Sequence, residues 1–293
     1  MKNINQKYGY YNLAITFVTL FSWICVYGLH GLMGVYAWSA IKFIFPILGL
    51  IGILLNIVLL VVYFFKKKTK FKILLNVSLC VVLAQHFLLT MNIVQLAYPV
   101  SIRSTQPSIT VKWPFAEQAI VGWGGNSTKN NLPHVIWPSE RWAYDLVMEP
   151  YHTGSKNAID YGVWDREVLS PIAGNVIEAY DEESDITPGT ENIISMEGNH
   201  VYLRIDSTGT YLLLNHLKKD SITVKVGDHV NAGDVLGRVG NSGSTSEPHL
   251  HIHHQRQDPT RTLYPILAEG LPLYFEDIDA EAMPVKGTVV TPE

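Results

Sequence analysis

The first hundred residues are dominated by long apolar runs, whereas the remaining residues form short runs broken by glycine, proline and aspartate. Three apolar runs are each long enough to cross about 30 Å of hydrocarbon as a helix, at about 1.5 Å per residue: 12–34, 43–65 and 73–95. The third is the weakest, because Gln85, His86 and Asn92 interrupt it. The pattern predicts an α-helical transmembrane region over residues 1–98.

Charge divides the chain at nearly the same place. Residues 1–100 hold eight lysines and no acidic residue, while the rest holds all 26 acidic residues, within a formal net charge of -4. Cytoplasmic loops beside membrane spans are enriched in Lys and Arg, so the loop KKKTKFK, 66–72, predicts the cytoplasmic side. One further span after this loop places the chain beyond about residue 100 outside the cytoplasm. We therefore predict a multi-pass protein of the cell membrane, in contact with lipid, with its C-terminal domain outside.

Several alternatives bear on this assignment. The first apolar run could instead be a signal peptide cut near AWSA, 37–40, which would also leave the C-terminal domain outside. A nucleic-acid partner is not expected, because the dense lysine cluster lies between two predicted spans and the rest of the chain is acidic. Cys25 and Cys80 both fall in apolar runs. A metal in the C-terminal part must therefore be held by His, Asp or Glu.

After Pro99 the chain changes to short β-type runs with turn residues between them. The run HVYLRID, 200–206, and the run YLLLNHL, 211–217, predict a hairpin in which Gly209 supplies the turn. We predict an all-β domain over 99–271, followed by an acidic peripheral strand and tail over 272–293.

The stretch SEPHLHIHH, which begins at Ser246, places four histidines within six residues. In an extended strand His249, His251 and His253 would share one face, while Leu250 and Ile252 would share the other. Imidazole is the commonest metal ligand and titrates near neutral pH, so this face could supply both a metal ligand and a proton-transfer group. Taken alone, the tract fits a solvated strand edge equally well.

A longer run resolves part of this ambiguity. The residues NHLKKDSITVKVGDHVNAGDVLGRVGNSGSTSEPHLHIH, 215–253, resemble the C-terminal half of the lysostaphin/LytM-type zinc metallopeptidases. In that family a Tyr-x-His-Leu-like strand, a Val-x-x-Gly-Asp turn, an Ile-Gly-x-x-Gly-x-Ser/Thr-Gly loop and Pro-His-Leu-His follow in this order. The resemblance covers about 130–260, including REVLSPIAGNVIEAYD, 166–181, which is similar to a hairpin of the family. It does not extend to the membrane region.

The resemblance implies a small antiparallel β fold and a zinc endopeptidase that cuts cross-bridge or stem peptides of bacterial peptidoglycan. It implies that His251 is a zinc ligand and that His249 and His216 are the catalytic histidines. Which of these two is the base stays open. In a regular strand His216 would share a face with Leu212 and Leu214, so a role as a hydrogen-bonded core histidine is the alternative.

The family's usual first metal motif, His-x-x-x-Asp, is absent, and two pairs compete to replace it. His134 and Asp145 lie in LPHVIWPSERWAYDLVM, which resembles a variant branch with an insertion after this motif. His152 and Asp160 lie in YHTGSKNAIDYGVW, where Lys156 stands at the position of the usual histidine. We favour His134 and Asp145, because Asp145 would emerge from a strand, a rigid mount for a ligand.

Other function classes remain open. The same fold can serve as a non-catalytic cell-wall-binding or regulatory module, and the spans could make the chain primarily a membrane partner or sensor. The intact histidines of the second half favour an enzyme. His253 and His254 have no counterpart in the resemblance, and His200 and His229 are expected to pack or to face solvent.

Overall fold

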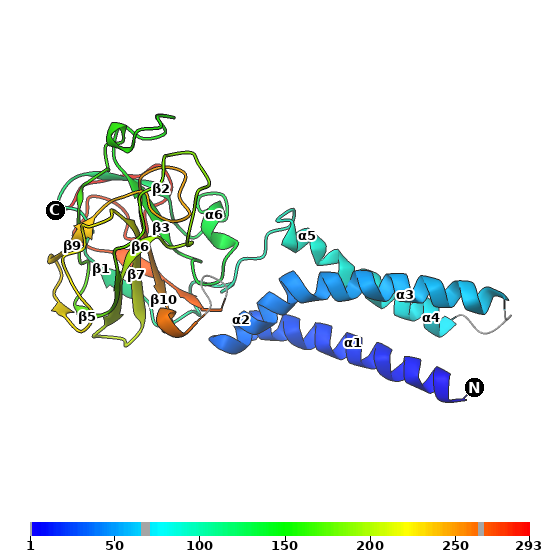
Figure 1. Ribbon diagram of the computed structural model, residues 1–293. Helices are drawn as coiled ribbons and strands as arrows, with labels where there is room; N and C mark the ends of the chain where they lie inside the picture. The colour runs from blue at the N-terminus through cyan, green and yellow to red at the C-terminus, as the bar shows by residue number, and fades with distance from the viewer. Residues whose placement is uncertain (1, 66–70, 263–266) are drawn as a thin grey trace. The chain divides into compact units, whose positions relative to one another are not determined.

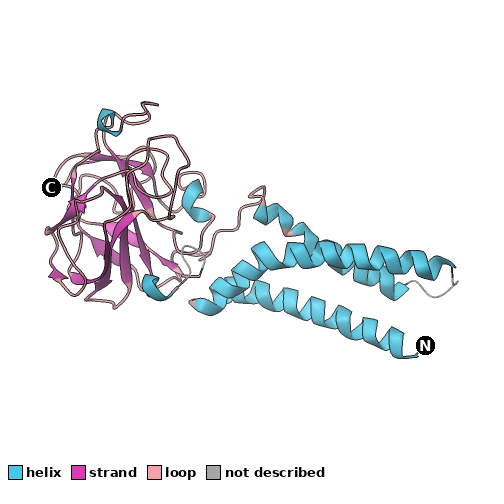
Figure 2. Ribbon diagram, in the orientation of Figure 1, coloured by secondary structure: helices cyan, strands magenta, loops and turns pink. Residues whose placement is uncertain are grey.

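The computed structural model describes residues 2–65, 71–262 and 267–293, and it divides into two compact units, Met1–Leu96 and Ala97–Glu293. The first unit is helical and the second is built mainly of strands (Figures 1 and 2). Most of the predicted cytoplasmic loop 66–72 lies outside the described residues.

The first unit contains a series of helices and one π-helical turn: α1 (Lys2–Gly28), α2 (Leu32–Ser39), the π-helix (Ala40–Ile44), α3 (Phe45–Phe65), α4 (Phe71–Gln85) and α5 (Phe87–Thr90). Among the described residues, three segments are long and apolar enough to span a membrane: Tyr10–Gly28, Leu32–Val62 and Ile73–Thr90. The three apolar helical segments predicted from the sequence are therefore present.

Their boundaries differ from the predicted ones at a glycine. Gly31 has φ 71° and ψ -158°, a backbone conformation that is essentially restricted to glycine and that a helix cannot contain. The chain therefore breaks between α1 and α2, inside the apolar run expected over 12–34. Hydropathy did not reveal this break, because the segments on both sides of it are mainly apolar.

Polar side chains link the helices of this unit. The Asn76 amide nitrogen donates to Asn12 Oδ1 at 2.7 Å, and the Asn56 amide nitrogen donates to Asn76 Oδ1 at 2.6 Å. These bonds connect α1, α3 and α4. His86 accepts a hydrogen bond from Trp23 Nε1 at 3.1 Å, which gives this histidine an interhelical contact. Each of these buried side chains therefore makes at least one hydrogen bond within the unit, although Asn56 Oδ1 itself accepts none from the described residues.

The second unit confirms the predicted all-β class. Its strands are β1 (Ile109–Val111), β2 (Ala119–Trp123), β3 (Tyr144–Val147), β4 (Glu167–Leu169), β5 (Gly174–Tyr180), β6 (Asn199–Ile205), β7 (Tyr211–Leu217), β8 (His229–Val230), β9 (Val235–Arg238), β10 (Leu250–Gln255), β11 (Gly270–Leu271), β12 (Leu273–Phe275) and β13 (Val289–Val290). Short helical turns lie between them: α6 (Leu132–Val135), Ala158–Asp160 and Pro259–Arg261.

The main sheet has nine strands in the order β13-β2-β3-β10-β7-β6-β5-β8, with β11 also paired to β10. Two smaller sheets pair β1 with β12 and β4 with β9. The central strands β3, β10 and β7 are hydrogen-bonded neighbours in antiparallel register. Side chains that these three strands carry on the same face therefore lie close together.

Alternation along β10 separates the core from the opposite face. Leu250 and Ile252 are fully buried in the hydrophobic core, where Ile252 lies opposite Leu214 of β7 and Tyr144 of β3. Burying a side chain of this size stabilises the fold by about 1.5–3 kcal/mol. A one-residue slip of β10 would exchange these side chains for histidines, so the core fixes the register.

The predicted hairpin over 200–217 is present, but the one expected over 166–181 is not. Strands β6 and β7 pair antiparallel, and Gly209 has φ 68° in the turn between them. Strands β4 and β5 do not pair with each other; β4 pairs with β9, and β5 pairs with β6 and β8. The hydrogen-bonding edge of β4 is taken by β9, where Glu167 also forms an ion pair with Arg238 at 2.8 Å.

Residues 272–293 contribute to the core as well as to the surface. Leu273, Phe275 and Val290 are buried core residues. Strand β12 pairs in parallel with β1, and β13 forms one edge of the main sheet beside β2. This segment therefore supports the sheet that carries the polar face described below.

Two buried histidines predict how the stability of this unit depends on pH. Burial lowers the pKa of His200 to about 4 and that of His254 to about 3. An unfolded chain binds protons on these groups near pH 6.5, whereas the folded chain does not. Their contribution is thus complete above about pH 6.5 and is lost as the pH falls toward the folded-state values.

We therefore expect the free energy of unfolding to fall by up to about 1.4 kcal/mol per pH unit for each of these histidines below pH 6.5. Urea unfolding of the parent and of His254→Asn between pH 7.5 and 4.5 measures this effect. The variant should show a shallower dependence on pH than the parent. Parallel curves for the two proteins would contradict the expectation.

Candidate functional site

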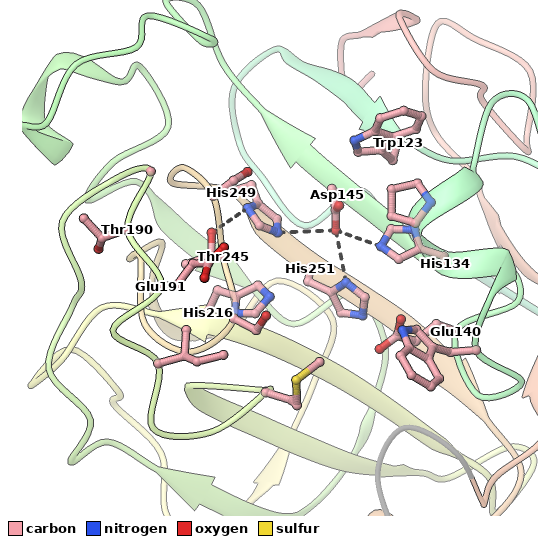
Figure 3. Close-up of a pocket in the computed structure, with 17 residues that line it drawn as sticks. Trp123, His134, Glu140, Asp145, Thr190, Glu191, His216, Thr245, His249 and His251 are labelled. Carbon is pink, nitrogen blue, oxygen red and sulfur yellow. Dashed lines mark hydrogen bonds and ion pairs between the residues drawn. The ribbon is translucent and has the colours of Figure 1, made fainter. Parts of the chain in front are cut away.

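The polar face of the central strands forms the floor of a pocket of about 700 Å³ (Figure 3). Its wall includes aromatic and acidic side chains as well as histidines. The lining includes Trp123, His134, Trp137, Glu140, Asp145, Glu191, His216, Thr245, His249 and His251. The Lys286 ammonium group lies over the Trp123 ring, 3.0 Å from its centroid, so the C-terminal segment also contacts the pocket wall.

Strand register brings Asp145 and His251 together. Asp145 on β3 lies directly opposite His251 on β10, and residues paired in this way project from the same face of a sheet. The distance between Asp145 Oδ1 and His251 Nδ1 is 3.0 Å. His249 stands two residues earlier on the same face, and its Nε2 lies 3.4 Å from the same carboxylate oxygen.

His134 reaches this oxygen from a different part of the chain. It lies on the short helix α6, and its Nε2 is 3.2 Å from Asp145 Oδ1. The possible ligand atoms of His134, Asp145 and His251 all lie within 4.8 Å of one another, and all three residues are largely shielded from solvent. Figure 3 shows the imidazoles arranged around Asp145.

The hydrogen bonds behind His134 determine which nitrogen carries its proton. The amide nitrogen of Asn131 donates to the carbonyl oxygens of Gly125 and Ala143, so Asn131 Oδ1 is oriented as an acceptor. His134 Nδ1 lies 2.7 Å from this oxygen and must be the donor. In the neutral imidazole the lone pair is then on Nε2, which faces Asp145.

The neighbours of His249 likewise determine which of its nitrogens carries the proton. Its Nδ1 lies 2.7 Å from the carbonyl oxygen of Glu247, which can only accept, and 3.1 Å from the Thr245 hydroxyl. The proton of neutral His249 therefore lies on Nδ1 and the lone pair on Nε2. This lone pair also points toward Asp145.

The lone pairs of these imidazoles and the Asp145 carboxylate repel one another unless a positive charge, such as a proton or a metal cation, lies between them. Burial raises the pKa of Asp145, but the surrounding histidines, with His134 foremost, outweigh it and hold this pKa well below its usual range. Burial likewise lowers the pKa of His134, but the Asp145 carboxylate outweighs it and shifts the pKa upward. The site is therefore built to hold an anionic carboxylate beside a cation.

The donor set fits a small divalent cation. Two imidazole nitrogens and one carboxylate oxygen are ligands typical of zinc, with bonds of about 2.0–2.2 Å. Ligands of a tetrahedral ion at these bond lengths are separated by roughly 3.4 Å. The observed separations of 3.0 and 3.2 Å from Asp145 Oδ1 are close to this value.

His216 faces the same pocket because strand β7 contains a bulge. The register between β6 and β7 shifts near His216, whose φ is 62°. This left-handed conformation costs a non-glycine residue roughly 1–2 kcal/mol. In a regular strand His216 would share a face with Leu212 and Leu214, but the bulge turns it away from the core and toward the pocket.

The bulge leaves His216 well anchored. Its Nδ1 lies 2.8 Å from the carbonyl oxygen of Ser242, so its lone pair lies on Nε2. Its ring centroid is 4.8 Å from that of His249 and 5.8 Å from that of His251. Burial, together with the charges of His249 and His251, holds the pKa of His216 well below its usual range. His216 is therefore a neutral imidazole at the pocket.

Comparison with protein families matches residues 151–262 to peptidase family M23. This part of the chain is thus similar to the peptidase M23 domain. The match includes His216, His249 and His251, and the predicted resemblance to lysostaphin and LytM-type peptidases is confirmed at the level of the family. No relative was found among curated proteins.

Several solved structures are similar to this chain. The antimicrobial peptidase lysostaphin from Staphylococcus simulans is 20% identical, with a TM-score of 0.34 and coverage of 55% of this chain and 50% of its own. A putative glycyl-glycine endopeptidase lytM from Ruminococcus gnavus is 23% identical, with a TM-score of 0.28 and coverage of 42% and 44%. A zinc containing peptidase from Vibrio cholerae is 19% identical, with a TM-score of 0.32 and coverage of 50% and 36%. This chain spans half or less of the length of each of these proteins.

The match to the M23 family begins after His134 and Asp145 and includes the competing pair, His152 and Asp160. The geometry separates the two pairs. His152 Nδ1 pairs with Glu247 at 2.5 Å, and Asp160 accepts a hydrogen bond from the Ser155 hydroxyl at 2.5 Å. Both His152 and Asp160 are exposed, and neither belongs to the group of possible metal ligands found among the described residues.

Sequence reasoning missed the supporting contacts of several residues around the site. Asn131 orients His134, and it stands at the N-cap of α6 with proline following in the first turn, which is a recognisable helix-start pattern. Thr245 contacts His249 but lies in a glycine- and serine-rich loop that gives no such signal. His253 contacts His251, and its position on the histidine face was evident from alternation alone.

Proposed function

We propose that this chain is a membrane-anchored zinc metalloendopeptidase that hydrolyses peptide bonds in bacterial peptidoglycan. The convergence of His134, Asp145 and His251, with His249 and His216 beside them, carries this proposal. Three protein ligands leave a fourth position open, as catalytic zinc sites require. A structural zinc site would instead be closed by a fourth protein ligand.

When bound at this position, zinc supplies a Lewis acid that activates water and polarises a peptide carbonyl. His249 and His216 present their Nε2 lone pairs to the pocket, since both Nδ1 atoms donate to backbone carbonyls. One of the two would accept the proton of the attacking water, and a protonated imidazole would deliver a proton to the leaving amine. The fixed Nδ1 contacts hold both rings in place during these transfers.

The substrate class rests on the sequence resemblance and on the predicted location of the domain. The ordered submotifs between Asn215 and His253 are similar to those of peptidoglycan endopeptidases. A domain outside the cytoplasmic membrane would meet peptidoglycan peptides there. The pocket wall adds Trp123 and Trp137, which can pack against a peptide backbone, and the carboxylates of Glu140 and Glu191.

The membrane location is itself part of the proposal. The three apolar helical segments would anchor the chain, and the lysine-rich loop 66–72 would face the cytoplasm. A protease added outside intact cells should degrade the chain beyond about residue 100 and leave a tag inserted at 66–72 protected. Protection of a C-terminal tag, with digestion of the loop tag, would reverse the orientation.

Digestion of purified cell walls tests the proposed activity. The full chain in detergent should release new amino termini from the walls, lose this activity on treatment with a chelator and regain it on addition of zinc. The alternative function, a non-catalytic cell-wall-binding module, predicts retention on the walls without new termini. A zinc-loaded, folded chain that behaves in this second way would contradict the proposed function.

A further inference from the structure

The nitrogen of His251 that faces away from Asp145 contacts another histidine. His251 Nε2 lies 2.9 Å from His253 Nδ1, and His253 Nε2 lies 3.2 Å from Gln255 Oε1. The amide nitrogen of Gln255 then donates to the carbonyl oxygen of Gln257 at 2.7 Å. His251, His253 and Gln255 occupy every second position of β10, so their side chains form a continuous row on one face of the strand.

The far end of this row fixes the direction of every hydrogen bond in it. The Gln257 carbonyl oxygen can only accept, so the Gln255 amide nitrogen faces it and Gln255 Oε1 faces His253. Since Oε1 is an acceptor, His253 Nε2 must carry a proton. A neutral His253 then has its lone pair on Nδ1, and this lone pair accepts from His251 Nε2–H.

This hydrogen-bond direction also determines which nitrogen of His251 is free to bind a metal. With its proton on Nε2, neutral His251 has its lone pair on Nδ1, which faces Asp145 Oδ1 at 3.0 Å. His253 is 0% exposed and Gln255 is 1% exposed. Water is thus excluded from this row, so its side chains bond to one another and not to solvent. In the other tautomer of His251, the lone pair on His251 Nε2 would face the lone pair on His253 Nδ1, and the two would repel.

We propose that His253 and Gln255 act as a relay that sets the tautomer of His251 and aims its Nδ1 at the bound metal. This inference rests on the proposed zinc site and extends it. His253 is then a positioning residue: it touches a ligand and not the substrate. Groups that hold a ligating histidine in this way typically contribute about 10- to 100-fold to metal affinity.

The next residue along the strand provides a matched control. His254 is 1% exposed and also makes two hydrogen bonds, to the Thr210 hydroxyl and to the Pro272 carbonyl oxygen. It projects from the opposite face of β10, away from the metal position. Substitution of His254 therefore tests the general cost of altering a buried histidine on this strand.

The experiment measures the zinc dissociation constant of the full chain in detergent by competition with a chromophoric chelator. His253→Ala removes the acceptor for His251 and should raise this constant about 10- to 100-fold, while His254→Gln should change it by less than about threefold. His253→Gln should restore most of the affinity, because its amide can accept from His251 and donate to Gln255. Gln255→Leu removes the far end of the relay and should also weaken binding.

Thermal unfolding of the zinc-free proteins identifies variants that do not fold. If His253→Ala does not fold, the comparison of His253→Gln and Gln255→Leu decides. Parent-like zinc affinity in folded His253→Ala or Gln255→Leu would overturn the relay, as would equal weakening by His254→Gln. Failure of the parent chain itself to bind zinc would instead overturn the proposed function on which the relay rests.

Discussion

Replacing His251 by alanine should empty the metal site and abolish peptidase activity, whereas replacing His249 by alanine should abolish activity and leave most of the metal bound. His251 belongs to the group whose ligand atoms lie within 4.8 Å of one another, while His249 lies beside this group. Loss of a group that transfers protons typically slows catalysis about 10²- to 10⁴-fold without removing the metal.

Zinc content per chain and the rate of peptide release from purified walls measure the two effects. His229→Ala is a suitable control, because His229 is an exposed residue of β8, outside the pocket, and its loss should change neither quantity. Equal loss of zinc from His251→Ala and His249→Ala would contradict the assignment of His251 as a metal ligand and His249 as a proton-transfer group. It would show that His249 is a ligand as well.

Replacing Asp145 by alanine should likewise empty the site, and replacing Asp160 by alanine should leave it filled. Asp145 Oδ1 is the atom on which His134, His249 and His251 all converge. Removing it would leave buried imidazoles without their anionic partner, so zinc binding and activity should fall together. Asp160 is exposed and bonded to Ser155, so its loss should have little effect on either.

The paired variants discriminate between two sequence motifs of the same chain. Zinc stoichiometry near one per chain in Asp160→Ala, and near zero in Asp145→Ala, is the expected result. The reverse outcome would assign the ligands to His152 and Asp160, within the span of the M23 family match, without altering the role of His251.

The histidine face of β10 could be predicted from sequence because it depends on local alternation alone. Leu250 and Ile252 fix the register by their burial, and His249, His251 and His253 must then share the opposite face. The placement of Asp145 followed in the same way from WAYDLVM, where Tyr144 and Leu146 alternate with it into the core. The assignment of chemical roles to these residues stays a prediction.

Other features could not be predicted because they depend on partners distant in sequence. The face of His216 is reversed by a bulge, whose extra residue is visible only in the pairing of β6 with β7. The expected hairpin over 166–181 is absent because β9 takes the edge of β4. Break points in apolar helices, such as Gly31, are likewise set by backbone conformation and not by hydropathy.

The supporting contacts of the site also depend on residues that local sequence patterns do not identify. Alternation placed His253 beside His251, but the direction of its hydrogen bonds depends on the carbonyl of Gln257, beyond the end of β10. The contribution of 272–293 to the core was masked by its acidic and proline-containing composition. Leu273 and Phe275 pack inward only because β12 pairs with β1, more than 150 residues earlier in the chain.

Mass spectrometry of the fragments released from purified peptidoglycan by the full chain tests the proposed function most directly. The zinc-loaded parent should release peptides that carry a new amino terminus and a new carboxyl terminus, with one water added per cleaved bond, and His251→Ala should release none. The identity of the two new termini would also give the bond that is cut. A folded, zinc-loaded parent that releases no more peptide than His251→Ala would contradict the assignment of this chain as a peptidoglycan endopeptidase.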